Sequence, residues 1–215
     1  MIRDAIGKDL ELDFRWMTLS VLDCAVLASV ISCCGELKEL DLSYTPRTLE
    51  CIRRLAKGLS CCNKVCLWSC RLTVRCCSAL SSALSAPNSQ LTELWLGENK
   101  KMEDSEVEQL CEGLRSANCK LKKLGLRSCL LTSACCSALS SVLSSPNSRL
   151  TYLDLDNNNL EDSGAQQLSW GLRSDNCKLE TLRLLSNGIS ESEKRNLWSV
   201  EKELRRSGRQ VDIYI

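Results

Sequence analysis

A recurring spacing of leucines constrains the fold of this chain more than any other feature. Within residues 121–150 the spacing is L-x-x-L-x-L-x-x-C-x-L, with Leu124 and Leu126 two positions apart. Because side chains alternate along a strand, these two leucines face the same side of a short strand. Residues 135–143 then place their apolar side chains at helical spacing, and Ser-Ser-Pro-Asn-Ser at 144–148 ends that helix. The stretch predicts one strand–turn–helix unit.

One such unit cannot bury its own apolar face, so the pattern must recur along the chain. Residues 62–119 and 121–177 repeat each other, and the offset is 59 from Cys70 to Cys129. The offset falls to 58 after one extra residue near Lys100 and Lys101. Two repeat types alternate: one has Cys at the turn after the strand, and the other has Asn there with an acidic helix start. We expect this Cys or Asn to point inward and to hold the turn.

Stacking of these units predicts a right-handed α/β solenoid, with a parallel sheet on the concave side and helices on the convex side. Residues 1–189 form about seven repeats, starting near 7, 37, 62, 91, 121, 150 and 179, and residues 190–215 form a C-terminal capping helix and strand. Ser190 and Glu193 have the spacing of a capping box at the start of that last helix. In the first unit we expect a helix over 19–32 with five inward residues, namely Val21, Leu22, Ala25, Val26 and Val30.

Composition and motifs exclude several functions. The chain has 28 basic and 27 acidic residues, which argues against a nucleic-acid partner. It has no run of 18 apolar residues that could span a membrane, so no membrane partner is expected. It contains no histidine, and hence no Ser-His or Cys-His pair, and no Gly-x-x-x-x-Gly-Lys-[Ser/Thr] phosphate loop. We therefore expect no catalytic residues, no enzyme activity and no cofactor in this chain.

The sixteen cysteines favour a cytoplasmic protein over a secreted one. Most occupy repeat-equivalent positions, such as Cys76 with Cys135 and Cys77 with Cys136, where a buried thiol behaves as a small apolar side chain. No Asn-x-Ser/Thr sequon occurs, which agrees with a reducing compartment. No Cys-x-x-Cys pair is present, so no metal site is predicted. The N-terminus lacks a signal peptide, and because the chain starts within the pattern we expect it to be a piece of a longer protein.

The concave face of the sheet is the candidate binding surface, because the strand positions that flank the inward leucines point to solvent. Two of the five tryptophans fall there on neighbouring strands, beside basic residues, and tryptophan is common at binding hot spots. A protein contact is predicted at Trp68, Trp95, Lys123, Arg127, Tyr152 and Asp154. A second, acidic contact zone for a basic partner is predicted at Asp9, Glu11, Asp13, Glu39 and Asp41. The alternatives at the aromatic patch are a small ligand, rings that only cover the sheet beneath Lys or Arg, and self-association of the chain. For the acidic zone the alternative is a plain solvated face.

The repeats resemble the ribonuclease-inhibitor class of leucine-rich repeats and, more narrowly, those of vertebrate NOD-like receptors, above all the set expanded in bony fish. The segments that carry this resemblance are LDCAVLASVISCCGELKELDLSY (22–44), CRLTVRCCSALSSAL (70–84) and LDLDNNNLEDSGAQQLSWGL (153–172). The resemblance implies a repeat arm of a cytosolic innate-immune sensor. Nucleotide would bind only to a separate nucleotide-binding module of the full-length receptor. The implied partner is that module of the same chain, with the arm opposing inflammasome-type oligomerisation or sensing a ligand.

Two other roles fit the same residues. The first is a stand-alone module that wraps around a protein, as ribonuclease inhibitors do, and the second is an adaptor subunit. A nucleotide-binding module upstream in the gene product distinguishes the receptor from the first role. The second role requires a short recruitment motif outside the repeats, and the sequence shows none.

Overall fold

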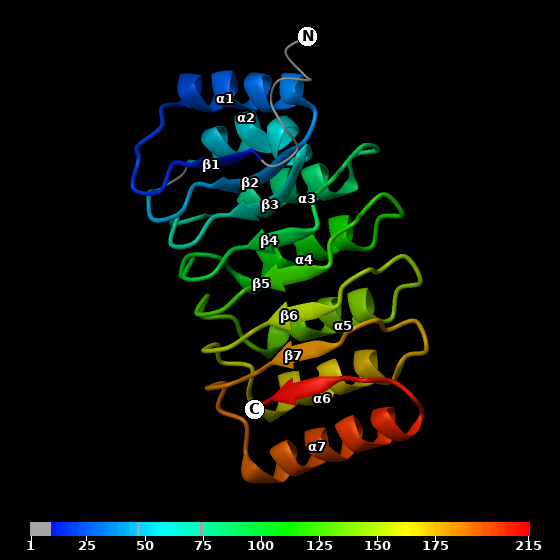
Figure 1. Ribbon diagram of the computed structural model, residues 1–215. Helices are drawn as coiled ribbons and strands as arrows, with labels where there is room; N and C mark the ends of the chain where they lie inside the picture. Colours follow the sequence, from blue (N-terminus) through cyan, green and yellow to red (C-terminus); the bar gives the residue numbers. More distant parts are fainter. Residues whose placement is uncertain (1–9, 47, 74) are drawn as a thin grey trace.

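The computed structural model describes residues 10–46, 48–73 and 75–215, which form a stack of strand–helix units in two layers (Figure 1). One layer is an eight-stranded sheet in the order β1 to β8, in which every neighbouring pair is parallel. Its strands are β1 Glu11–Asp13, β2 Leu37–Asp41, β3 Cys62–Cys66, β4 Glu93–Trp95, β5 Lys123–Gly125, β6 Tyr152–Asp154, β7 Thr181–Arg183 and β8 Asp212–Tyr214.

Helices form the other layer, and each one follows a strand of the sheet. They are α1 Val21–Cys34, α2 Leu49–Leu59, α3 Cys76–Ser85, α4 Asp104–Leu114, α5 Cys136–Leu143 with a preceding 3-10 turn at Ser133–Cys135, α6 Glu161–Arg173 and α7 Glu191–Arg206. The predicted leucine-rich-repeat solenoid is confirmed, because the strand order follows the chain and each crossover is a helix.

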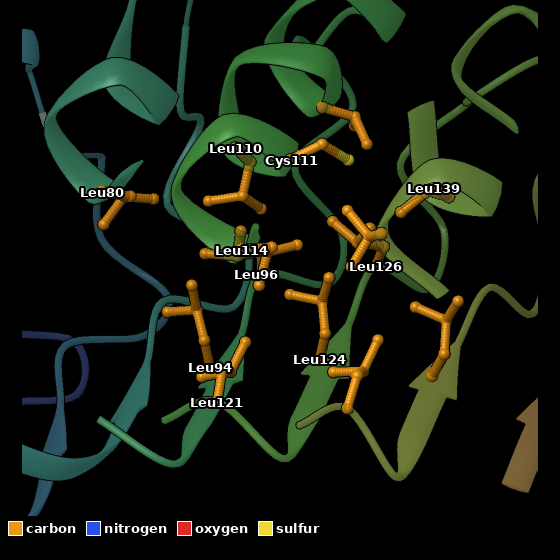
Figure 2. Close-up of a cluster of buried hydrophobic side chains, with 14 of the residues drawn as sticks. Leu80, Leu94, Leu96, Leu110, Cys111, Leu114, Leu121, Leu124, Leu126 and Leu139 are labelled. Carbon is orange, nitrogen blue, oxygen red and sulfur yellow. The ribbon is translucent and has the colours of Figure 1, made fainter. Parts of the chain in front are cut away.

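The core lies between the two layers and is built from leucines in register. Leu94 of β4 is aligned with Leu124 of β5, and both side chains are fully buried. Leucines from the helices, among them Leu110 and Leu114 of α4, close over these strand residues (Figure 2). Each unit thus buries its apolar side chains against its neighbours, and stability depends on the stack.

The turn residues hold adjacent units together through the inward hydrogen bonds that the sequence predicts. Asn158 Nδ2 donates to the carbonyl oxygens of Leu126 and Leu155, at 2.9 Å each. Cys129 donates from Sγ to the carbonyl oxygen of Leu96 at 3.4 Å. Thr45 occupies this position in the second unit, where its buried hydroxyl has no hydrogen-bond partner among the residues that the structure describes. Cys129 and Asn158 thus both donate to a backbone carbonyl of the preceding repeat, whereas Thr45 does not within the described part of the chain.

The helices approach one another most closely at three glycines. A Cβ atom on Gly58 of α2 would lie 2.9 Å from the Cα atom of Ala28 in α1. Gly113 of α4 faces Ser81 of α3, and Gly171 of α6 faces Ser140 of α5, at comparable separations. Three helix pairs, α1/α2, α3/α4 and α5/α6, result from this spacing.

The predicted inward face of the first helix is wrong. Val21 is 37% exposed, Leu22 73%, Val26 56% and Val30 50%, and Ala25 is only partly buried. The buried residues are Cys24, Ala28 and Ile31. α1 is apolar nearly all round, so its periodicity did not determine which side meets α2.

The predicted capping box at the last helix forms only in half. Ser190 Oγ accepts from the Glu193 N–H at 3.2 Å, but the Ser190 N–H donates to Asp162 Oδ1 at 2.7 Å. The Glu193 carboxylate is buried and instead accepts from Gln166 and Asn196. The cap thus comes from the preceding repeat, and the hydrogen bonds from Ser190 lower the pKa of the Asp162 carboxyl.

Candidate functional site

The concave face carries parallel rows of side chains, because the strands are in register. One row contains Lys64, Glu93, Lys123 and Tyr152, and the next contains Cys66, Trp95, Gly125, Asp154 and Arg183. Trp68 follows β3 and lies two residues further along its strand direction than Cys66. The two predicted tryptophans are therefore in different rows.

Each of the two indoles packs flat on the sheet over one glycine, which leaves room for the ring. A side chain on Gly97 would clash with the six-membered ring of Trp68, and one on Gly125 would clash with the ring of Trp95. Each indole therefore leans over the strand that follows its own. The absence of a Cβ is required at both positions, since the rings occupy that space.

Trp95 pairs with Tyr152 rather than with Trp68. The Trp95 and Tyr152 ring centroids are 5.8 Å apart at an interplanar angle of 58°, which is a favourable tilted arrangement. Trp95 Nε1 donates to Glu93 Oε2 at 3.3 Å, which orients the indole. All three aromatic side chains are half-buried, so they offer part of their surface to a partner.

The predicted cations are exposed, but each is paired with a carboxylate. Lys123 Nζ lies 2.8 Å from Glu93 Oε1, and Arg127 Nη1 lies 3.9 Å from Asp156 Oδ2. Asp156 is almost fully buried and also binds Arg183 at 2.8 Å. The surface around the aromatic residues is thus close to electrically balanced, and the rings are its distinctive feature.

Asp154 does not face solvent as the sequence predicted. Its side chain is 6% exposed, and Oδ1 accepts the Asp156 N–H at 3.0 Å, which turns the carboxylate back onto its own strand. Burial raises the pKa of the Asp154 carboxyl, and the nearby Asp156 charge raises it further. Asp154 is therefore a turn-forming residue beneath the surface, and it is removed from the candidate contact.

Replacing Asp154 by Asn is expected to raise the midpoint of thermal unfolding at pH 7. The folded-state pKa of Asp154 lies above its ordinary value of 3.8, so the charged form costs stability once the pH exceeds that value. Asn keeps the acceptor for the Asp156 N–H and removes the charge. The gain should shrink as the pH falls toward 3.8, because protonation of the wild-type Asp154 carboxylate removes the same charge. Asp156→Asn is the matched contrast and should lose stability, because Arg183 would lose its carboxylate partner.

The predicted acidic zone has mostly paired charges. Asp9 lies outside the described residues. The other four carboxylates lie near three cations, with the shortest distances Glu11–Lys38 2.8 Å, Asp13–Arg15 2.7 Å, Asp41–Arg15 3.7 Å and Glu39–Lys64 2.9 Å. The hydrogen bonds from Arg15 lower the pKa of Asp13 to about 2. The zone therefore has much less uncompensated charge than its sequence implies.

Three potential metal-ligand atoms meet on β2 and β3, from Glu39, Asp41 and Cys66, all within 4.8 Å of one another. Cys66 Sγ donates to Glu39 Oε1 at 3.6 Å, and Lys64 binds the same oxygen. Burial raises the pKa of the Cys66 thiol to about 12, which opposes the thiolate that a metal needs. The group fits a hydrogen-bonded cluster, and we assign no metal to it.

Sequence reasoning missed two exposed aromatic groups. Trp16 and Tyr44 stack with centroids 4.4 Å apart, and both have a left-handed backbone, with φ of 63° and 66°. Other units place Ser, Glu or Asn at this turn position, so aromatic residues at this position in two neighbouring units could have predicted the exposed pair. Trp170 of α6 and Trp198 of α7 are exposed on the helical side, at 69% and 47%. Within the described ranges, no helix has the length and apolar character needed to cross a membrane.

The chain is a leucine-rich-repeat protein, as its stacked units and parallel sheet indicate and as a family match supports. The family model described as Leucine Rich Repeat matches residues 149–170. An internalin from Listeria monocytogenes has a similar fold, with a TM-score of 0.52 and 20% sequence identity over 87% of this chain and 49% of that one.

More specifically, the repeats are similar to those of NACHT, LRR and PYD domains-containing proteins. Protein 3 of Macaca mulatta is 48% identical over 145 residues, which is 66% of this chain and 14% of the relative. Protein 1a allele 1 of Rattus norvegicus is 46% identical over 117 residues, which is 53% of this chain and 9% of the relative. The resemblance to the leucine-rich repeats of NOD-like receptors is thus confirmed, whereas the bony-fish assignment stays a prediction. The matches span only about a seventh of the first relative's length.

Proposed function

We propose that this chain is a non-enzymatic protein-interaction arm of a cytoplasmic NOD-like receptor, and that its concave aromatic surface packs against the receptor's own nucleotide-binding module. The concave aromatic surface is defined by Trp68, Trp95 and Tyr152. The observation that carries the proposal is the set of half-buried rings seated over Gly97 and Gly125 among charges that already have partners. Aromatic side chains that are already held in one orientation lose little conformational entropy when a partner binds.

In the resting receptor this contact would oppose the oligomerisation of the nucleotide-binding module. A ligand or signal that binds the arm better when it is released would shift the balance toward the active form, since only a difference in affinity moves an equilibrium. Nucleotide would be held by the separate module, and this chain would supply the packing surface alone.

The test is binding of the chain to the nucleotide-binding module of the same receptor, measured by light scattering after size-exclusion chromatography. Trp68→Ala/Trp95→Ala should weaken the complex at least tenfold, because hot-spot truncation typically costs about 2 kcal/mol or more. The matched control is Trp170→Ala/Trp198→Ala, which removes two exposed tryptophans from the helical side and should leave binding unchanged.

Equal binding by wild type and the concave double variant would contradict the proposed surface. If the wild type does not bind the module at all, the autoinhibitory role is wrong, and a stand-alone inhibitor or adaptor becomes the better hypothesis.

A further inference from the structure

On the helical face a groove lies between α1 and α2, and an equivalent groove lies between α3 and α4, each beside a glycine at which the two helices approach closely. Counted back from Gly58 and Gly113, the same three positions of α2 and α4 line or flank these grooves, and the equivalent positions before Gly171 lie on α6. They are Arg53, Arg54 and Lys57 in α2, then Glu108, Gln109 and Glu112 in α4, then Gln166, Gln167 and Trp170 in α6. The fold repeats, but the charge at these positions does not.

The first groove is basic. Arg53, Arg54 and Lys57 form its wall on α2, and the wall on α1 consists of small side chains without a carboxylate. Arg54 is bound to Glu50 at 2.7 Å, whereas no ion pair is found for Arg53 or Lys57 within the described residues. Two cations of this groove are thus available to a partner.

The second groove is acidic. The sequence of α4, DSEVEQLCEGL, has four acidic residues and no basic one. Glu112 lines the groove with four serines of α3, and Glu108 is exposed on the same helix. Neither carboxylate has an ion pair in the part of the chain that the structure describes. The uncompensated charges of α2 and α4 are therefore opposite in sign.

A neutral helix separates these two charged helices. α3 has the sequence CCSALSSALS, without a charged residue, and its exposed positions include Ser78 and Ser82. In the stack it lies between α2 and α4 (Figure 1). Along the helical face the order is thus positive, small and neutral, then negative.

We propose that this face docks against the same face of a second copy of the chain, around a two-fold axis over α3. In an isologous contact a patch meets its own image, so α2 of one copy faces α4 of the other, and the reverse pair forms as well. The dyad rotation therefore matches both charged bands at once. Small serine side chains at the axis let the two α3 helices approach closely. This surface is on the opposite side of the molecule from the concave aromatic surface, and the proposal stands without the receptor function.

The contact is electrostatic and exposed, so it is weak and sensitive to salt. Sedimentation velocity of the full chain should show dimers at about 50 mM salt and monomers at about 500 mM, because the distance over which charges attract shortens as the ionic strength rises. Arg53→Glu/Lys57→Glu makes both bands negative, and Glu108→Lys/Glu112→Lys makes both bands positive. Each variant alone should be monomeric at low salt.

Mixing the two variants is the decisive step. In the mixed pair every negative band faces a positive one, so a heterodimer should form with a salt dependence like that of the wild type. Lys202→Glu/Arg206→Glu on α7 is the matched charge-reversal control and should dimerise normally. Circular dichroism of each variant checks that it is folded. A wild type that stays monomeric at low salt, a variant that dimerises alone, or a mixture that stays monomeric would each overturn the proposal.

Discussion

Replacing Glu106 by Ala is expected to lower the free energy of unfolding by about 3 kcal/mol, because two backbone N–H groups at the start of α3, one of them buried, lose their acceptor. The Glu106 side chain is fully buried in α4, yet its carboxylate serves the start of α3. Oε1 accepts the Arg75 N–H at 2.6 Å, and Oε2 accepts the Cys77 N–H at 3.3 Å. Arg75 occupies the N-cap position with a left-handed backbone and gives no side-chain cap, so the carboxylate replaces it.

The negative charge also suits this place, since a helix N-terminus carries a partial positive charge. Glu106→Gln should lose less than the alanine variant, because the amide keeps one acceptor oxygen for one of the two N–H groups. Glu108→Ala is the control on the same helix and should change stability by no more than about 0.5 kcal/mol, as is usual for an exposed position. Urea unfolding followed by circular dichroism measures all three. If Glu106→Ala unfolds at the same urea concentration as Glu108→Ala, the carboxylate does not hold α3.

Replacing Gly113 by Val is expected to destabilise the chain by about 3 kcal/mol or more, because α3 and α4 would have to separate. A Cβ on Gly113 would lie 2.6 Å from the Ser81 carbonyl oxygen and 2.8 Å from the Ser81 Cα atom. These are backbone atoms, which cannot rotate out of the way as the end of a flexible side chain can. Separation of the pair would also open the core around Leu80 and Leu110.

The adjacent residue provides the control, since Glu112→Val adds the same β-branched side chain to α4 at a position where the native side chain is already exposed. Thermal unfolding of both variants should show a large loss for Gly113→Val and a small one for Glu112→Val. Shortening Ser81 to Gly should not rescue Gly113→Val, because the carbonyl oxygen and Cα remain. Rescue by that change would mean that the hydroxyl, rather than the backbone, sets the helix spacing.

Much of the fold was encoded locally and could be predicted from the sequence. The spacing of Leu124 and Leu126 predicts a strand, and the Cys or Asn that recurs three residues after the second leucine predicts an inward hydrogen bond, as Cys129 and Asn158 show. The strand and the inward polar residue could both be predicted because they depend on nearby residues in the sequence or on the fixed step between repeats. The parallel sheet and the helical layer follow from that step.

The site was only partly predictable, because its details depend on contacts between units. The sequence placed Trp68 and Trp95 on one face, but only the register of β3 to β5 separated them into rows and seated them over Gly97 and Gly125. Alternation predicted an exposed Asp154, whereas a hydrogen bond to the Asp156 N–H turned it inward.

The sequence by itself thus determined the repeat, its period and the strand leucines of the core, because these depend on the two-residue alternation of a strand and on the fixed step between repeats. Only the tertiary structure decided which face of an apolar helix is covered, which carboxylate caps which helix, and which charges remain unpaired. Packing against α2 decides that α1 exposes Leu22 and Val26, and packing against α3 decides that Glu106 accepts from the Arg75 N–H. Such contacts join residues about thirty positions apart, beyond the reach of a local pattern.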